Sequence, residues 1–210
     1  MQISLISPIK SDIRKLVRHP FFVNYQITPE NITFQKFPEG FPGLLKIIIG
    51  QQISFKVADA LWIRACNLAD GEENITAEWV LNQKAETLKS IGLSTQKQKY
   101  AQSLSETTIS GAFDFNEIKD LPDSYVIEKI TGLYGFGIWS AQIYCMLCLT
   151  RRNILPQNDL AVNKMLISLY EMKEEMSRKK LLEATKEFEG KYTALTLLLW
   201  YLYVTQKNWC

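Results

Sequence analysis

Apolar residues recur every three or four positions along most of this chain, and that spacing is typical of amphipathic α-helices. The pattern predicts helices over residues 44–68, 77–91, 97–109, 125–130, 138–149, 160–172 and 177–204. Short polar or glycine-containing stretches separate them, and no apolar run is long enough to span a membrane. We therefore expect an all-α protein.

The first 43 residues follow a different pattern. Residues 11–19 are compatible with a short helix, whereas 22–37 lie among prolines and are predicted to be irregular or extended. We find no linker long enough to separate independent domains. At 210 residues, 47% of them hydrophobic, the chain is long enough to bury a core as a single compact domain, 1–210.

A glycine-rich turn joins two of the predicted helices, with glycine at positions 132, 135 and 137. Glycine permits positive φ angles and close approach of a second backbone. The first amides of the helix that follows have no intrahelical partner and suit phosphate oxygens. The turn therefore predicts a grip on a nucleic-acid backbone, while the alternative is an ordinary turn in which glycine caps a helix.

Asp159 follows Leu155-Pro156-Gln157-Asn158 and directly precedes the helix predicted from Leu160. A carboxylate at a helix start is stabilised by the helix dipole, and it can in turn stabilise positive charge that develops nearby. The alternative is that Asp159 is only an N-cap. Capping and catalysis are compatible roles for one carboxylate.

Four blocks of sequence together resemble the helix-hairpin-helix DNA glycosylases, and among them the 3-methyladenine DNA glycosylase II branch. The blocks occur in the family's order, at 48–54, 91–97, 134–142 and 155–159. The likeness covers roughly residues 40–205. It implies a two-lobed helical fold with a middle lobe at about 44–150, a second lobe formed by 1–43 plus 151–210, and an active-site cleft between the lobes.

The resemblance also implies a reaction. Such enzymes flip a damaged nucleotide out of the duplex and break its N-glycosidic bond, and Asp159 would stabilise the cationic sugar and orient water. Relatives that also cut the strand carry a hairpin lysine that forms a Schiff base. Trp139 occupies that position here, and no lysine or arginine occurs between Thr131 and Thr150. We expect a monofunctional glycosylase that releases alkylated purines such as 3-methyladenine and 7-methylguanine.

The resemblance and the residue types also predict the surroundings of the flipped base. Trp139 is expected to form a pocket wall, with Tyr134, Tyr144 and Trp200 as further aromatic candidates, although each is also compatible with a core position. Gln52 is expected to fill the gap left in the duplex, and the alternative is that Gln51 and Gln52 cap or brace a helix turn. The candidate DNA-backbone contacts are Gly135, Gly137, Ile138, Lys97 and Arg152.

Soft metal ligands are few. Cys145 and Cys148 lie within an apolar helix without a second pair at zinc-ribbon spacing, which leaves Cys66, Cys210 and His19. The cysteine-rich loop of the iron–sulfur relatives is also missing, so we expect neither zinc nor a cluster and no required cofactor. The resemblance implies a structural Na⁺ or K⁺ site at the hairpin carbonyls of Thr131, Leu133 and Phe136.

Charge adds little to this picture. The net charge is only +2 and the isoelectric point is about 8.2, a mild version of the basic balance expected of DNA-binding domains. The first nine residues are too short and polar for a signal sequence. We expect an intracellular monomer, cytoplasmic and nucleoid-associated if bacterial, whose partner is double-stranded DNA with a damaged base and which has no membrane partner.

Alternative functions remain open. A non-catalytic helix-hairpin-helix module would need the glycine turn but have no use for Asp159. A glycosylase for deaminated bases such as uracil or hypoxanthine would use the same machinery with a different pocket. A helical protein-interaction domain would account for the periodicity and for neither motif.

Overall fold

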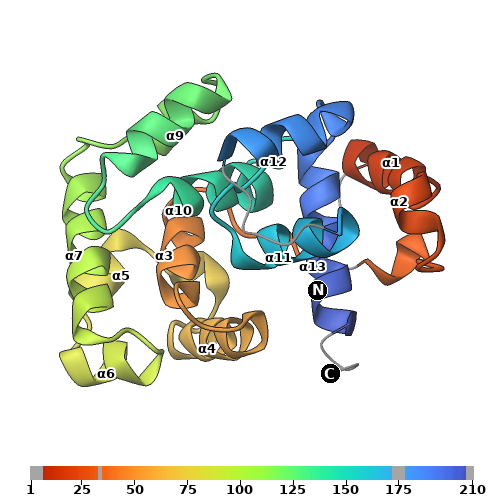
Figure 1. Ribbon diagram of the computed structural model, residues 1–210. Coiled ribbons are helices and arrows are strands. Elements are labelled where there is room, and N and C mark those ends of the chain that lie inside the picture. The colour runs from red at the N-terminus through yellow and green to blue at the C-terminus, as the bar shows by residue number, and fades with distance from the viewer. Residues whose placement is uncertain (1–6, 33–34, 172–177, 207–210) are drawn as a thin grey trace. The chain divides into compact units, whose positions relative to one another are not determined.

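The computed structural model describes residues 7–32, 35–171 and 178–206. Every regular element within those ranges is an α-helix, a 3-10 helix or a π-helical turn (Figure 1). The all-α prediction is therefore confirmed. Met172, Ser177 and Cys210, which the sequence analysis included, lie outside the described residues.

The chain divides into two compact units. The middle unit is Phe37–Leu149, and the terminal unit combines Met1–Lys36 with Thr150–Cys210. The middle unit includes residues before position 44 because the Phe37 N–H donates to the Leu147 carbonyl (2.9 Å) and the Gly40 N–H donates to the Tyr144 hydroxyl (2.9 Å). A cleft between the lobes stays a prediction.

In the middle unit, α3 carries the most apolar sequence and is buried along almost its whole length. It contacts α4, α7, α10 and η3, so the core of this unit surrounds it. The elements are α3 (Phe41–Gly50), α4 (Phe55–Leu68), η2 (Glu72–Asn74), α5 (Ala77–Leu81), α6 (Ala85–Ser90), α7 (Thr95–Ile109), α8 (Phe115–Ile118), α9 (Asp123–Thr131), α10 (Ile138–Ile143) and the π-helical turn η3 (Tyr144–Cys148).

In the terminal unit, α13 is the central element and packs against α11 and α1. Its apolar residues are buried on several sides, as its continuous hydrophobic sequence requires. The elements are α1 (Ser7–Leu16), α2 (Pro20–Val23), η1 (Pro29–Asn31), α11 (Leu160–Leu169), α12 (Arg178–Thr185), η4 (Lys186–Phe188) and α13 (Tyr192–Gln206).

Several predicted boundaries were wrong. The helix predicted over 44–68 is two helices, because residues 51–54 form a turn and Ser54 Oγ accepts from the Val57 N–H (3.4 Å) to start α4. The helix predicted over 177–204 is interrupted at Gly190, whose φ of +83° is left-handed, and helical structure resumes as α13. At the N-terminus, α1 begins before residue 11, and part of the segment predicted to be irregular forms α2 and η1.

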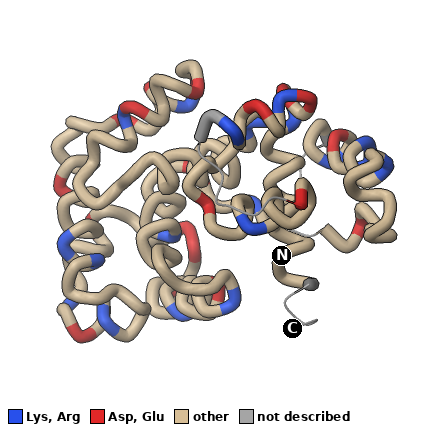
Figure 2. The backbone as a smooth tube through the Cα atoms, viewed as in Figure 1, with Lys and Arg blue, Asp and Glu red and all other residues tan. Residues whose placement is uncertain are grey.

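Lysine and arginine positions are interspersed with aspartate and glutamate positions in each unit (Figure 2). This distribution agrees with the small net charge of +2. No helix among the described residues has the length and hydrophobicity needed to cross a membrane.

Candidate functional site

Asp159 is the N-cap of α11 and is only 7% exposed. Its Oδ1 accepts two hydrogen bonds, from the Val162 backbone N–H (2.9 Å) and from the indole Nε1–H of Trp200 (3.0 Å). Its own backbone N–H donates to the Pro156 carbonyl (3.0 Å). Both the backbone and the side chain of Asp159 are thus held in one orientation.

These contacts suit a carboxylate that must stay negatively charged in a buried place. An ion removed from water is costly unless hydrogen bonds replace its hydration, and Oδ1 receives two such bonds. The N-terminal end of α11 adds a favourable dipole. A fixed, largely dehydrated carboxylate is a group that can stabilise a nearby cation without having to reorganise.

The loop before Asp159 is anchored to the start of α13. The Thr193 N–H donates to the Arg152 carbonyl (3.0 Å), the Thr193 hydroxyl donates to the Arg151 carbonyl, and the Ile154 N–H donates to that hydroxyl (3.4 Å). Since α13 also carries Trp200, one helix positions both the loop and the partner of Asp159. The sequence periodicity gave no signal for this arrangement.

The four aromatic pocket candidates lie in different surroundings. Trp200 is 1% exposed and its indole N–H is directed at Asp159, so the observed contact is with the carboxylate. Tyr144 is 1% exposed in the middle unit, where its hydroxyl accepts from Gly40. This burial argues against Tyr144 as a pocket wall. Tyr134 is exposed and Trp139 half-buried, so stacking of these two on a base stays a prediction.

The glycine turn runs from the end of α9 to the start of α10. Gly135 has a φ of +91°, and a Cβ built there would lie 2.2 Å from the ring of Tyr100. Glycine is therefore required at 135 for two separate reasons. Gly137 is the N-cap of α10 and has no side-chain cap, and Ile138 after it is 50% exposed. The exposed start of this helix is where phosphate binding is predicted.

The predicted cation site involves the same turn. The Leu133 carbonyl accepts the Phe136 N–H (3.2 Å), so one of the three carbonyls already takes part in the turn itself. Cation binding at Thr131, Leu133 and Phe136 stays a prediction. Within the described residues, no group of three or more His, Cys, Asp or Glu side chains could hold a metal ion.

The two basic residues predicted to contact DNA have intramolecular partners instead. Arg152 donates from Nε (3.0 Å) and from Nη2 (2.8 Å) to the carboxylate of Asp12, which is 2% exposed. Lys97 donates from Nζ to the carbonyls of Ile49 and Gln51, each at 2.8 Å. Both cations therefore have structural partners within the protein, and a contact of either with a DNA phosphate stays a prediction.

The turn at residues 51–54 holds two glutamines with different surroundings. Gln52, the predicted wedge, is exposed and has a left-handed φ of +61°. Gln51 donates from Nε2 to the Gly135 carbonyl (3.1 Å) and to Ser140 Oγ (3.2 Å). The sequence offers Gln51 only as a residue that caps or braces a helix turn, and it carries no signal for the bonds to the hairpin.

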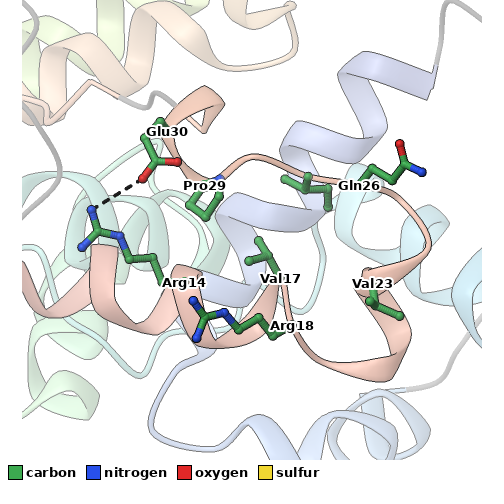
Figure 3. Close-up of a pocket in the computed structure, with 8 residues that line it drawn as sticks. Arg14, Val17, Arg18, Val23, Gln26, Pro29 and Glu30 are labelled. Atoms are coloured by element: carbon green, nitrogen blue, oxygen red, sulfur yellow. Dashed lines mark ion pairs between the residues drawn. The ribbon is translucent and has the colours of Figure 1, made fainter.

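The terminal unit also contains a hollow of about 420 Å³ (Figure 3). The residues that line it come from α1, α2, η1 and the segments between them: Arg14, Val17, Arg18, Val23, Gln26, Ile27, Pro29 and Glu30. Glu30 is the only carboxylate in this lining, and it is solvent-exposed and paired with Arg14 at 3.5 Å. Asp159 is the stronger candidate because it is both buried and fixed.

Comparison with known proteins connects this site to a family. A family model described as "HhH-GPD superfamily base excision DNA repair protein" matches residues 45–189, which include the glycine turn and Asp159. The chain belongs to this family. The resemblance seen in the four sequence blocks is thereby confirmed at the level of the superfamily.

Individual proteins with similar sequences also carry the names of DNA glycosylases. DNA-3-methyladenine glycosylase 1 of Schizosaccharomyces pombe is 26% identical over 125 residues, which are 59% of this chain and 55% of that protein. The chain spans between 55% and 62% of the length of the curated relatives it matches.

Two solved structures extend the likeness to nearly the whole chain. A DNA-3-methyladenine glycosidase from Bacillus halodurans is 27% identical, with a TM-score of 0.69, covering 98% of this chain and 94% of that one. The S. pombe 3-methyladenine DNA glycosylase in complex with abasic DNA has a TM-score of 0.71 at 21% identity, covering 96% and 97%. The second match shows a shared fold.

Proposed function

We propose that this protein is a DNA glycosylase of base excision repair that releases alkylated purines by hydrolysis, with Asp159 as the catalytic carboxylate. The observation that carries the proposal is the buried Oδ1 of Asp159, held by the Val162 and Trp200 N–H donors in a member of the HhH-GPD family. The names of the relatives favour alkylated purines over deaminated bases.

The chemistry follows from the charge of this group. The bond between C1′ of the deoxyribose and the base nitrogen breaks, and its electron pair leaves with the base. Positive charge then develops on C1′ and the ring oxygen, where an anion lowers the energy of the transition state. Water adds its oxygen to C1′ and loses a proton, which leaves a free base and an abasic site. No redox step occurs, so we propose that no cofactor is required.

Hydrolysis without strand cleavage is the second part of the proposal. A β-elimination enzyme needs an amine that can reach C1′ and form a Schiff base. The segment between Thr131 and Thr150 carries no lysine, and in the middle unit the amine of Lys46 is buried against the ring of Phe37. Borohydride trapping on lesion-containing DNA is therefore expected to give no covalent adduct.

DNA binding is proposed through the exposed start of α10 and the turn at residues 51–54. The helix offers backbone N–H groups to phosphate, and the exposed Gln52 side chain is free to enter the duplex. The solved relative in complex with abasic DNA supports this choice of partner. Such binding depends on the DNA backbone and on the damaged base, and it does not distinguish one DNA sequence from another.

A panel of duplexes tests the proposal. Each carries 3-methyladenine, 7-methylguanine, hypoxanthine or uracil at one position, and release of the free base is measured under single turnover. We expect release of the methylated purines, with strand breaks only after alkali treatment. Release of uracil or hypoxanthine alone would favour a glycosylase for deaminated bases. Binding without release of any of the four would favour the non-catalytic module.

A further inference from the structure

In the turn between α3 and α4, Gln52 has a backbone conformation that residues other than glycine rarely adopt. Its φ is +61°, in the left-handed region, and the residue is neither glycine nor asparagine. The side chain is exposed, so packing around the side chain does not impose this conformation. Such a backbone persists only where neighbouring contacts fix it.

Lys97 supplies one of these contacts from the first turn of α7. Its Nζ donates to the carbonyls of Ile49 and Gln51, each at 2.8 Å. The two carbonyls belong to the end of α3 and to the residue just before Gln52, where the helix has acceptors without intrahelical partners. A charged donor there makes stronger hydrogen bonds than a neutral one and also opposes the negative end of the helix dipole.

The cost of placing Lys97 there indicates that the contact matters. Burial lowers the pKa of its amine, and no carboxylate among the described residues forms a salt bridge with it. The carbonyls therefore take the place of the lost water. An exposed lysine that reached for a phosphate would keep its hydration.

Gln51 supplies the second contact, and it leads to the hairpin. Its side-chain Nε2 donates to the Gly135 carbonyl (3.1 Å) and to Ser140 Oγ (3.2 Å). Its backbone carbonyl is the one that Lys97 binds. One residue thus connects the turn that carries Gln52, the start of α7 and the glycine turn that precedes α10.

We propose that Lys97 and Gln51 form a clamp that holds Gln52 in position to enter the duplex and couples it to the hairpin that grips the DNA backbone. This inference rests on the proposed function. A side chain that must fill a gap in the base stack binds with less loss of entropy when its backbone is fixed beforehand. Because Gln51 is bonded to the hairpin, the position of the phosphate that the hairpin binds also determines the position at which the Gln52 side chain enters the duplex. Lys97 and Gln51 are positioning residues and need not contact DNA themselves.

The test compares Lys97→Met with Lys99→Met. Lys99 lies on the same helix and is exposed, so both variants lose one positive charge but only the first loses the clamp. Hydrogen–deuterium exchange on the free proteins is expected to be faster in Lys97→Met at residues 49–53 and 133–140, and unchanged in Lys99→Met. Unchanged exchange at both segments in Lys97→Met would overturn the clamp.

Base release supplies the second readout. Lys97→Met is expected to lose about tenfold or more in the single-turnover rate on a normally paired lesion, because small displacements of positioning groups have large effects. The loss should be smaller when the lesion lies opposite a tetrahydrofuran abasic analogue, where the lesion has no partner base to be separated from. Equal losses on both duplexes, or equal losses in Lys97→Met and Lys99→Met, would contradict the positioning role.

Gln51→Leu serves as a second variant in case Lys97→Met does not fold. It removes the side-chain bonds to Gly135 and Ser140 but keeps the carbonyl that Lys97 binds, so faster exchange is expected at 133–140 and, to a smaller extent than in Lys97→Met, at 49–53. Faster exchange at 49–53 alone would contradict the coupling. If the wild-type protein released no base, the proposed function would fail, whereas the exchange measurements would still decide whether the clamp exists.

Discussion

At the scale of the residue, the pairing of Asp159 with Trp200 is central to the proposed chemistry. Asp159 is recognisable in the sequence as an N-cap because it directly precedes an apolar helical pattern. Trp200 is not recognisable in this role, since it lies 41 residues away and meets Asp159 only because α13 packs against α11. Its apolar surroundings in sequence predicted burial but not the direction of its N–H.

Trp200→Phe tests this pairing. The variant keeps an aromatic ring and loses the N–H donor, so we expect base release to slow by about tenfold or more, the equivalent of roughly 1.4 kcal/mol. The matched control is Trp62→Phe, which removes another indole N–H bonded to a carboxylate, Glu72, at 3.1 Å. Both variants should lose stability in urea unfolding. Equal rates of base release in the two would show that the Trp200 bond is only structural.

Lys46 makes a separate prediction about stability. Its side chain is 3% exposed, with Nζ 4.2 Å from the ring centroid of Phe37 and 3.9 Å from Asp59 Oδ1. Burial lowers the pKa of Lys46 from its ordinary 10.5, and the attraction of Asp59 only partly offsets this. The charged amine therefore costs the folded state free energy.

Lys46→Met should raise the free energy of unfolding near neutral pH by roughly 1 kcal/mol. The difference should shrink as the pH rises toward 10.5, because the folded wild type releases its proton before the unfolded chain does and so gains stability in that window. Urea unfolding at several pH values measures this, with the exposed Lys56→Met as control. A difference that grew with pH would contradict the assignment.

At the scale of the element, the hairpin and the turn at residues 51–54 both depend on left-handed backbone. Periodicity predicted most of the helices but not the break after Gly50, because Ile49, Ile53 and Val57 keep the helical spacing across it. The turn forms through long-range contacts, from Lys97 and to the hairpin, that no local pattern encodes. The break at Gly190 also contains a glycine, and its left-handed φ is typical of a helix end.

Comparing Gly135→Ala with Gly111→Ala separates the cost of backbone strain at a positive φ from the cost of a steric clash with Tyr100. Both glycines have positive φ, +91° and +73°, but a Cβ at 111 would meet nothing within 4 Å whereas one at 135 would strike Tyr100. We expect Gly111→Ala to lose about 1 kcal/mol of unfolding free energy. Gly135→Ala should lose on the order of 2–4 kcal/mol and bind duplex DNA more weakly. Equal losses would mean that the ring contact has no energetic weight.

At the scale of the whole molecule, the two units carry different parts of the proposed function. The hairpin, Gln51, Gln52 and Lys97 belong to the middle unit, and Asp159 and Trp200 belong to the terminal unit. The terminal unit is built from both ends of the chain, so contacts between α1 and the segment after Thr150 must hold it together. Arg152 and Asp12 form such a contact.

Arg152→Gln should therefore destabilise the protein instead of weakening DNA binding. The change leaves the buried Asp12 carboxylate without its bidentate partner, and we expect a loss of roughly 2 kcal/mol or more, moderated because Arg152 is half exposed. Arg14→Gln is the control, since its pair with Glu30 is exposed and worth about 0–1 kcal/mol. If Arg152→Gln instead left stability unchanged and made the DNA-binding constant fall less steeply with salt concentration, Arg152 would be identified as a phosphate contact.

The most direct test of the proposed function is single-turnover release of a methylated purine by wild type and Asp159→Asn. Asparagine is as good an N-cap as aspartate, so the variant should fold and bind DNA normally while lacking the negative charge. We predict that Asp159→Asn binds an abasic duplex with wild-type affinity and releases base about 10²–10³-fold more slowly. Release at the wild-type rate by this variant would contradict the role assigned to Asp159.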